Sequence, residues 1–191
     1  MDGHVQVERP RLREPKGSEF MDKKVYELIN DQINAELYSA YLYMSFADYY
    51  EEEGLEGYAN YYMIQAAEER DHALVFRNYL HDNGEKIKLA AIGQPDKEFA
   101  DFMGPLEAAY EHERYITSRI NEIYAAAYEV NDSRCMAFLD WFIDEQMEEE
   151  TNADDMITKM RLFGSDAKAL YDLDREYASR VYTTPSPLAN A

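Results

Sequence analysis

The sequence has few of the features that mark secreted or membrane-spanning proteins. It contains one cysteine, Cys135, so no disulfide can form within the chain, as is usual in a reducing compartment. No apolar run approaches the roughly 20 residues of a membrane-spanning helix, and the N-terminus lacks the apolar core of a secretory signal. We therefore expect a cytoplasmic protein in which Cys135 is a small buried side chain.

Positive charge is also scarce. The 191 residues include 19 Lys and Arg against 39 Asp and Glu, which gives a net charge of −20. Such a surface attracts cations and repels nucleic acid and anionic membranes, so neither is expected as a partner. Strong acidity often accompanies disorder, but 46% hydrophobic and 14% aromatic residues favour a folded protein. The length suits one domain with a substantial core.

The first 20 residues differ from the remainder. The stretch MDGHVQVERPRLREPKGSEF has no helical period and two prolines, and a second methionine, Met21, follows it directly. The letters GSEF read like the translation of two adjacent cloning sites. We therefore interpret residues 1–20 as an appended leader outside the fold, with a displayed peptide or a native extension as the alternative. The predicted domain spans residues 21–180, and residues 181–191 form a C-terminal tail.

From Met21 onwards, hydrophobic residues recur with a helical period. The pattern predicts four long helices and a short fifth, over residues 22–53, 56–82, 104–130, 134–163 and 166–179. Gly54 and Asn83-Gly84 are natural ends for the first two helices. In the first helix, the predicted inward face is the stripe Val25, Leu28 or Ile29, Ile33, Leu37, Ala40, Met44 and Ala47.

The lengths of the connections predict how these helices are arranged. The first and third connections are a few residues long, so each joins an antiparallel pair. Residues 84–103 are enough to run the length of a bundle, and their KIKLAAIGQP stretch can be extended. Four long helices with one long crossover between the second and third form an all-α, ferritin-like four-helix bundle, here followed by a short fifth helix.

Each long helix carries a carboxylate near its middle, on the face that it should bury. In chain order these polar positions are Glu36, Glu69 with His72, Glu113, and Gln146 with Glu149. One such residue would be explained by a place at the rim or by an ion pair. An isolated buried carboxylate costs several kcal/mol and normally protonates, so four at matching heights are reasonable only around cations. Oxygen ligands with one imidazole suit iron or manganese, and the i, i+3 spacing lets Glu69 and His72 point at one centre.

Further acidic residues adjoin these positions. Glu68 precedes Glu69, and the stretch DEQMEEE contains Glu145, Glu148 and Glu150. Glu150 fits a solvated acidic face. The other three fit a solvated face and a further cation site equally well.

Four segments together resemble the four helices of prokaryotic non-haem ferritins: QINAELYSAYLY (32–43), AAEERDH (66–72), YEHERYITSRINEI (110–123) and FLDWFIDEQMEEE (138–150). The resemblance covers about residues 21–178. It implies iron storage in a homo-oligomeric, hollow shell of 24 subunits. Fe(II) would be oxidised by dioxygen or peroxide at a centre within each subunit and stored as a ferric mineral. The short fifth helix resembles the one that lines channels at the fourfold axes of the shell.

The resemblance also implies roles for single residues. The first iron would be held by Glu36, Glu69 and His72. Glu69 would bridge to a second iron, held by Glu113 with Glu149 or Gln146 nearby. A third iron site would be formed by Glu68, Glu145, Glu148 and Glu149. Tyr43 matches a tyrosine beside the dinuclear centre, although its position alone is equally consistent with core packing.

Departures from related families narrow this interpretation. Bacterioferritins repeat Glu-x-x-His on the fourth helix, whereas residues 145–149 contain no histidine, so haem is not expected. One cysteine excludes the CxxC-containing iron module of rubrerythrins. Dps-type mini-ferritins lack the fifth helix. A second hypothesis is structural, in which the shell serves as a scaffold for the N-terminal peptide.

Overall fold

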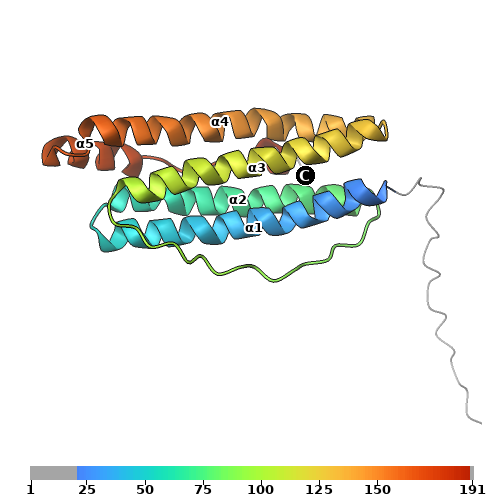
Figure 1. Cartoon of the computed structure of the whole chain (residues 1–191), viewed down its shortest axis with the longest axis horizontal. Coiled ribbons are helices and arrows are strands. Elements are labelled where there is room, and N and C mark those ends of the chain that lie inside the picture. The colour runs from blue at the N-terminus through green and yellow to red at the C-terminus, as the bar shows by residue number, and fades with distance from the viewer. Residues whose placement is uncertain (1–20, 190–191) are drawn as a thin grey trace, which may run out of the picture.

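The computed structural model describes residues 21–189, and the predicted leader, residues 1–20, lies outside them. Its elements are α1 (Lys23–Glu52), α2 (Glu56–Asp82), α3 (Met103–Glu129), α4 (Ser133–Phe163), α5 (Ala167–Ala178) and the one-turn α6 (Ser186–Ala189). The four long helices lie side by side as a bundle, and α5 sits at one end of it (Figure 1). The predicted all-α bundle with a short fifth helix is confirmed. Among the described helices, none is long and apolar enough to cross a membrane.

The long helices begin and end where local chemistry predicts. The Asp22 carboxylate caps α1 by accepting the backbone N–H groups of Lys24 and Val25 at 2.8 and 3.3 Å. Asp132 caps α4 through the N–H of Cys135 at 2.9 Å. Gly54 and Gly84, which follow α1 and α2, have φ angles of 78° and 77°, a conformation that costs glycine little.

The long crossover runs the length of the bundle beside α1, as predicted (Figure 1). Residues 85–99 form neither helix nor strand, and side chains of α1 bond some of their backbone groups. Asn30 donates from Nδ2 to the carbonyl of Lys88 at 2.9 Å and accepts the N–H of Lys88 at 2.8 Å. The Tyr26 hydroxyl donates to the carbonyl of Lys86 at 2.7 Å. The crossover therefore brings α3 back to the end of the bundle where α2 begins.

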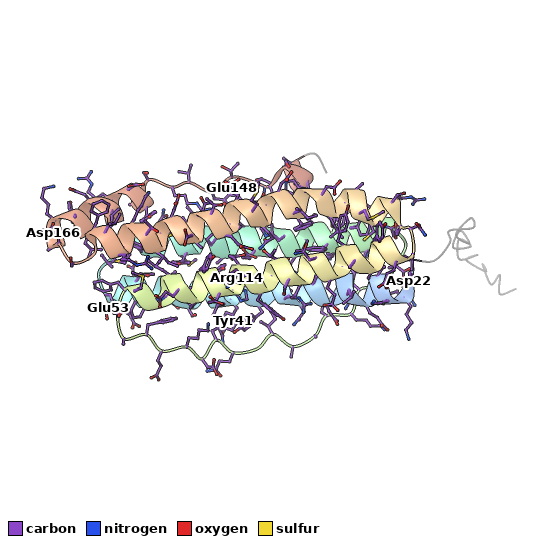
Figure 2. All side chains as sticks on the ribbon, turned by 45° about the horizontal axis from the view of Figure 1, so that its top comes forward. Asp22, Tyr41, Glu53, Arg114, Glu148 and Asp166 are labelled. Carbon is purple, nitrogen blue, oxygen red and sulfur yellow. The ribbon has the colours of Figure 1, made fainter. Side chains whose placement is uncertain are left out.

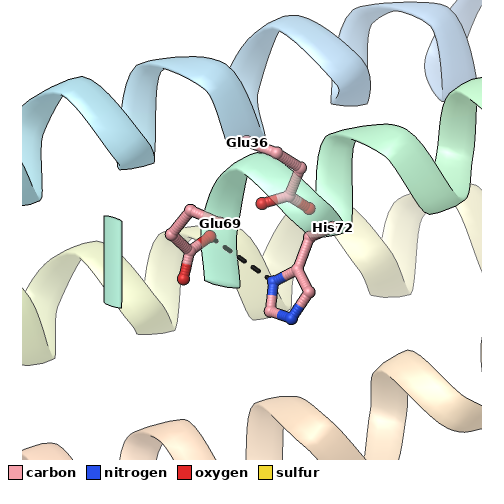
Figure 3. Close-up of side chains that lie close together, drawn as sticks. All are labelled: Glu36, Glu69 and His72. Carbon is pink, nitrogen blue, oxygen red and sulfur yellow. Dashed lines mark ion pairs between the residues drawn. The ribbon is translucent and has the colours of Figure 1, made fainter. Parts of the chain in front are cut away.

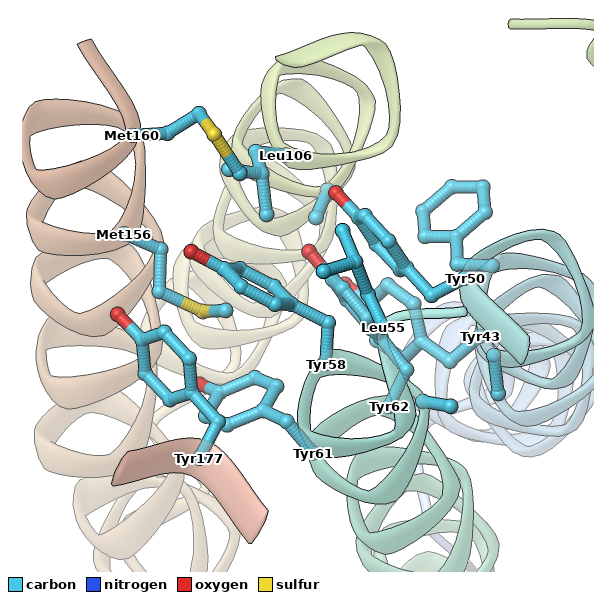
Figure 4. Packing of buried hydrophobic residues seen from close by; sticks show 14 of the residues in the cluster. Tyr43, Tyr50, Leu55, Tyr58, Tyr61, Tyr62, Leu106, Met156, Met160 and Tyr177 are labelled. Carbon is cyan, nitrogen blue, oxygen red and sulfur yellow. The ribbon is translucent and has the colours of Figure 1, made fainter. Parts of the chain in front are cut away.

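Two apolar clusters fill the bundle. The tyrosine cluster lies at the α5 end and includes Tyr43, Phe46, Tyr50, Tyr58 and Tyr62, with Tyr177 of α5 packed onto it (Figure 4). The isoleucine cluster lies at the other end and includes Ile29, Ile33, Phe76, Ile116, Ile120, Ile123 and Phe142. Cys135 is buried in this second cluster, as predicted.

Buried polar residues separate the two clusters on every long helix. In α1, Glu36 lies between Ile33 of the isoleucine cluster and Leu42 of the tyrosine cluster. In α3, Glu113 likewise lies between Ala109 and Ile116. The buried polar residues at this level of α2 and α4 include Glu69, His72, Gln146 and Glu149. The fold therefore encloses one polar layer between two apolar ones.

The predicted inward stripe of α1 is wrong at three positions of its second half, although Ala47 is buried as predicted. Met44 is 42% exposed, and Leu37 and Ala40 are only half-buried. Tyr43 and Phe46 are buried instead. The buried face passes through three polar side chains: Gln32, Glu36 and Ser39. Apolar residues directly follow the buried positions Glu36, Ser39 and Tyr43, so a stripe predicted from hydrophobicity lies one residue too far along the chain.

Candidate metal centre

Three buried residues from two helices present ligand atoms that one cation could share. Glu36 projects from α1, and Glu69 and His72 project from α2; each is 1% exposed. One ligand atom of each lies within 4.8 Å of those of the other two. Figure 3 shows the two carboxylates and the imidazole turned toward one another, with Glu69 Oε2 3.5 Å from His72 Nδ1. The i, i+3 spacing puts Glu69 and His72 on one face of α2.

Each member of this group has a buried atom that finds no hydrogen-bond partner in the described part of the chain. These atoms are Oε2 of Glu36, Oε1 of Glu69 and Nε2 of His72. A buried polar atom is normally paired, and leaving it unpaired costs about 1–3 kcal/mol. A cation would relieve that cost for the carboxylates, and a set of oxygens with one imidazole suits iron or manganese. The residues present therefore fit a metal ion.

Glu113 of α3 is held by two donors. Its Oε1 accepts a short hydrogen bond from the Tyr43 hydroxyl, and its Oε2 accepts one from Gln146 Nε2 at 3.0 Å. Burial raises the pKa of Tyr43 well above 10, and the charge of Glu113 raises it further, so the phenol stays a neutral donor. Tyr43 is thus both a core residue and a partner of a predicted metal ligand.

Glu149 of α4 closes the polar layer. It is 6% exposed, and its Oε2 accepts a hydrogen bond from Gln65 Nε2 at 2.8 Å. A cavity of about 10 Å³ lies among Glu113, Glu149, Gln65 and Tyr43, with further apolar and tyrosine walls. That volume is close to what one water molecule needs. The space beside the two carboxylates is therefore large enough for about one water molecule.

The four carboxylates act on one another electrostatically. Burial raises the pKa of Glu36, Glu69, Glu113 and Glu149, and those of Glu69 and Glu149 rise most. The charges of Glu113 and Glu36 raise the pKa of Glu69 further, and those of Glu113 and Glu69 do the same for Glu149. Glu113 and Glu149 are therefore within electrostatic reach of the three-residue group, although their oxygens lie outside it.

The predicted third site is less enclosed. Glu68 and Glu145 are half-buried, and Glu148 is exposed on α4 (Figure 2). Glu145 Oε1 lies 3.9 Å from His72 Nε2, so it faces the centre from outside. Glu150, which was predicted to be solvated, is half-buried and accepts a hydrogen bond from Thr117 Oγ1 at 2.5 Å. The predicted third site stays a prediction.

Sequence reasoning missed the amides that orient the carboxylates. Gln32 Nε2 donates to Glu36 Oε1 at 2.8 Å, and Arg119 Nε in turn donates to Gln32 Oε1 at 2.7 Å. Gln65 plays the equivalent part for Glu149. Gln32 lies four residues before Glu36, and Gln65 lies four before Glu69, so both share the buried face of a predicted ligand. That spacing was a signal that the sequence contained.

Comparison with known proteins agrees with this geometry. Residues 26–163 match the ferritin family, described as a ferritin-like domain. A probable bacterial non-haem ferritin-like protein of Haemophilus influenzae is 35% identical over 157 residues, which cover 82% of this chain and 95% of that protein. The bacterial non-haem ferritin of Staphylococcus aureus is 33% identical over 163 residues, or 85% of this chain and 98% of its own length.

Solved structures of a ferritin from the archaeon Archaeoglobus fulgidus are also similar. Its open-pore form superposes with a TM-score of 0.82 at 40% identity, over 84% of this chain and 98% of that one. A closed form engineered by mutagenesis gives 0.83 at 40% identity, over 85% and 99% of the two chains. The chain belongs to the ferritin family of iron-storage proteins, among the non-haem ferritins of prokaryotes.

Proposed function

We propose that the protein oxidises Fe(II) at a dinuclear centre between its four long helices and stores the ferric product as a mineral inside a shell of 24 copies. The observation that carries this proposal is the buried group of Glu36, Glu69 and His72, each of which offers a ligand atom within 4.8 Å of those of the other two. Each also has a buried atom without a hydrogen-bond partner among the described residues. Nothing in an apolar core compensates for such atoms, whereas a cation does. Iron is the substrate and the cargo of this site.

The geometry suggests which residues would hold each iron ion. Glu36, Glu69 and His72 would bind the first. Glu69 has one oxygen facing His72 and a second without a hydrogen-bond partner in residues 21–189, so it can bridge to a second ion. Glu113 would hold that second ion, with Glu149 or Gln146 beside it. Two ions placed together can give electrons to one molecule of dioxygen or peroxide.

The remaining contacts would keep these ligands in place. Gln32 and Gln65 each donate to one oxygen of a carboxylate and leave the other oxygen available. The rings of Trp141 and Phe142 meet the His72 ring edge-on at centroid distances of 5.6 and 5.9 Å, which restricts its rotation. Ligands fixed in this way need little rearrangement when an ion enters.

The overall charge supports a role in cation uptake. A net charge of −20 per chain raises the local concentration of Fe(II) around any assembly of such chains. The similar solved structures include an open-pore ferritin and an engineered closed form of the Archaeoglobus fulgidus ferritin. We infer the same kind of assembly for this chain, with α5 beside a channel through it.

Aerobic addition of Fe(II) to the purified protein tests the proposal. The parent should oxidise iron rapidly and keep the ferric product in solution. Glu69→Ala should lower the initial rate at least about tenfold, because the ligand that both ions share is lost. Glu122→Ala, which removes an exposed carboxylate of α3, is the matched control and should behave as the parent does. Equal rates in all three proteins would refute a working centre at this place.

The scaffold hypothesis concerns residues 1–20, which the structure does not describe. It predicts that a chain starting at Met21 oxidises and retains iron as the full chain does, because the leader would be carried passively. A difference in assembly or oxidation between the two chains would give the leader another role.

A further inference from the structure

The chain does not end at α5 but turns back along the bundle. Residues 179–189, which we call the returning segment, leave the end where α5 lies and carry α6 to the side of α2 (Figure 1). Leu188 of α6 packs against the isoleucine cluster, at the far end of the polar layer. The returning segment therefore passes the level of the metal centre.

Several contacts fix this segment on α2. Asn60 Nδ2 donates to the carbonyl oxygens of Tyr177 and Arg180, at 3.2 and 3.1 Å. Further along, the Tyr182 hydroxyl donates a short hydrogen bond to the carboxylate of Asp71, which is buried. The backbone on either side of Arg180 is thus held against the helix that carries Glu69 and His72.

Arg180 reaches from this segment to Glu68. Its Nη2 lies 2.6 Å from Glu68 Oε2, and the two side chains are only 25% and 16% exposed. The guanidinium also lies 4.2 Å from the centroid of the Tyr61 ring, and its Nη1 donates to the Tyr61 carbonyl at 3.3 Å. A partly desolvated, charge-assisted pair with a stacked guanidinium is stronger than an exposed one.

Glu68 stands at the side of the centre. It precedes Glu69 in the chain, and it lies close enough to Glu145 and His72 for their charges to act on it. Glu145 in turn lies 3.9 Å from His72 Nε2, an atom with no hydrogen-bond partner among the described residues. A cation held by Glu68 and Glu145 would therefore lie beside the dinuclear centre.

We propose that Arg180 is a positioning residue that serves as the counter-ion of Glu68 and weakens the binding of a third metal ion there. A divalent cation that takes Glu68 as a ligand must displace the guanidinium, since both need the same carboxylate oxygens and repel each other. A metal ion would then bind the third site weakly and leave it quickly, as expected for an ion in transit. This inference rests on the proposed function.

Calorimetric titration with Zn(II), which binds oxygen and nitrogen ligands but undergoes no redox chemistry, tests the inference without iron or turnover. Arg180→Gln should tighten the weakest Zn(II) site at least about tenfold, as expected for the loss of one charge-assisted competitor. In a Glu68→Gln background, the same substitution should have no effect on Zn(II) affinity. This double-mutant cycle assigns the change to the Arg180–Glu68 pair.

Two further variants separate charge from packing. Arg180→Lys keeps the positive charge but loses the stacked, forked contact, so it should bind Zn(II) nearly as weakly as the parent. Arg77→Gln removes an equal charge from an exposed residue of α2, the helix that carries Glu68, and it should leave the affinity unchanged. If Arg180→Lys and Arg180→Gln tighten binding equally, Arg180 acts through packing alone and the inference is wrong.

The outcome is also distinguishable from a failure of the proposed function. If the parent and Glu69→Ala bind Zn(II) equally, Glu36, Glu69 and His72 do not form a metal site, and the proposed function fails. Binding there with no response to Arg180→Gln would overturn the counter-ion role and leave the centre standing.

Discussion

Four glutamates at the level of the metal centre are buried by at least nine-tenths, a place where this side chain is rarely found without a partner. Each has a donor or ligand group nearby, but the donors are amides, a phenol and one imidazole rather than lysine or arginine. Their charges are therefore only partly compensated. In the metal-free chain, burial raises their pKa values and so favours the protonated carboxyl groups.

Replacing Glu69 by Gln should stabilise the metal-free protein at neutral pH. Burial, then Glu113 and Glu36, raises the pKa of Glu69 in the folded state. Its contribution to stability is therefore fully present below its unfolded pKa of about 4.3 and is lost as pH rises through the folded pKa. The advantage of Glu69→Gln over the parent should grow from pH 5 to pH 8 and reach about 1 kcal/mol or more.

Urea unfolding at these two pH values, with EDTA and at one protein concentration, measures this difference. Glu122→Gln is the control, because Glu122 is exposed on α3. A constant difference between Glu69→Gln and the parent at both pH values would contradict the raised pKa.

Tyr43→Phe decides whether the Tyr43 hydroxyl matters beyond core packing. The substitution keeps the ring, which lies 5.6 Å from the Phe46 ring centroid, and removes only the donor to Glu113. Fe(II) oxidation should slow about tenfold, as for other groups that orient a metal ligand, while the thermal midpoint changes little. An unchanged oxidation rate would leave Tyr43 as a core residue only.

At the scale of the helices, the bundle could be predicted because turn residues and the helical period are strong signals. Gly54 and Asn83-Gly84 mark helix ends in the sequence and do so in the structure. The second half of the inward stripe of α1 could not be predicted from hydrophobicity, because polar residues occupy the buried face there. The polar residues that interrupt the hydrophobic pattern thus include the candidate ligand Glu36 and its hydrogen-bond donor Gln32.

The candidate site could be predicted in part for the same reason. Glu36, Glu69 and His72 stood out as charges on apolar faces, and the structure brings their ligand atoms together. Arg180 could not be found, because its contact with Glu68 joins residues 112 positions apart and depends on how the chain turns after α5. Contacts of that kind follow from tertiary packing and leave no periodic signal.

An acidic side chain of α5 binds the N-terminus of α2. Asp174 Oδ1 accepts the backbone N–H groups of Gly57 and Tyr58, at 2.8 and 3.1 Å, and so caps α2, whose own N-cap residue Leu55 offers no side-chain acceptor. The fit is close, since a Cβ on Gly57 would lie 1.7 Å from the Asp174 carbonyl oxygen. Helix α5 is therefore docked on α2 by supplying the N-cap that α2 lacks.

Asp174→Ala should lower the free energy of unfolding by about 1 kcal/mol, the usual worth of an N-cap. It should also speed amide hydrogen exchange in α5, while Zn(II) binding at the centre stays as in the parent. Asp172→Ala is the control, because within the described residues Asp172 forms an ion pair with exposed Lys168 on the same helix. Unchanged exchange in α5 would show that Tyr177 and its aromatic neighbours alone hold that helix.

At the scale of the whole molecule, one polar layer crosses a bundle that is otherwise apolar at both ends. The acidic surface draws cations to the chain, the four helices offer them ligands, and the returning segment covers one side of the layer with Arg180. Storage requires an enclosed volume, which a single bundle does not have. Under the proposed function, oxidation takes place within the subunit, whereas the assembled shell provides the volume for storage.

The most direct measurement is an anomalous-difference map of crystals that have been soaked anaerobically with Fe(II). We predict one iron peak bound by Glu36, Glu69 and His72 and a second beside Glu113 and Glu149, with Glu69 touching both. Peaks confined to exposed carboxylates, with none between the four helices, would contradict a dinuclear iron centre in this protein.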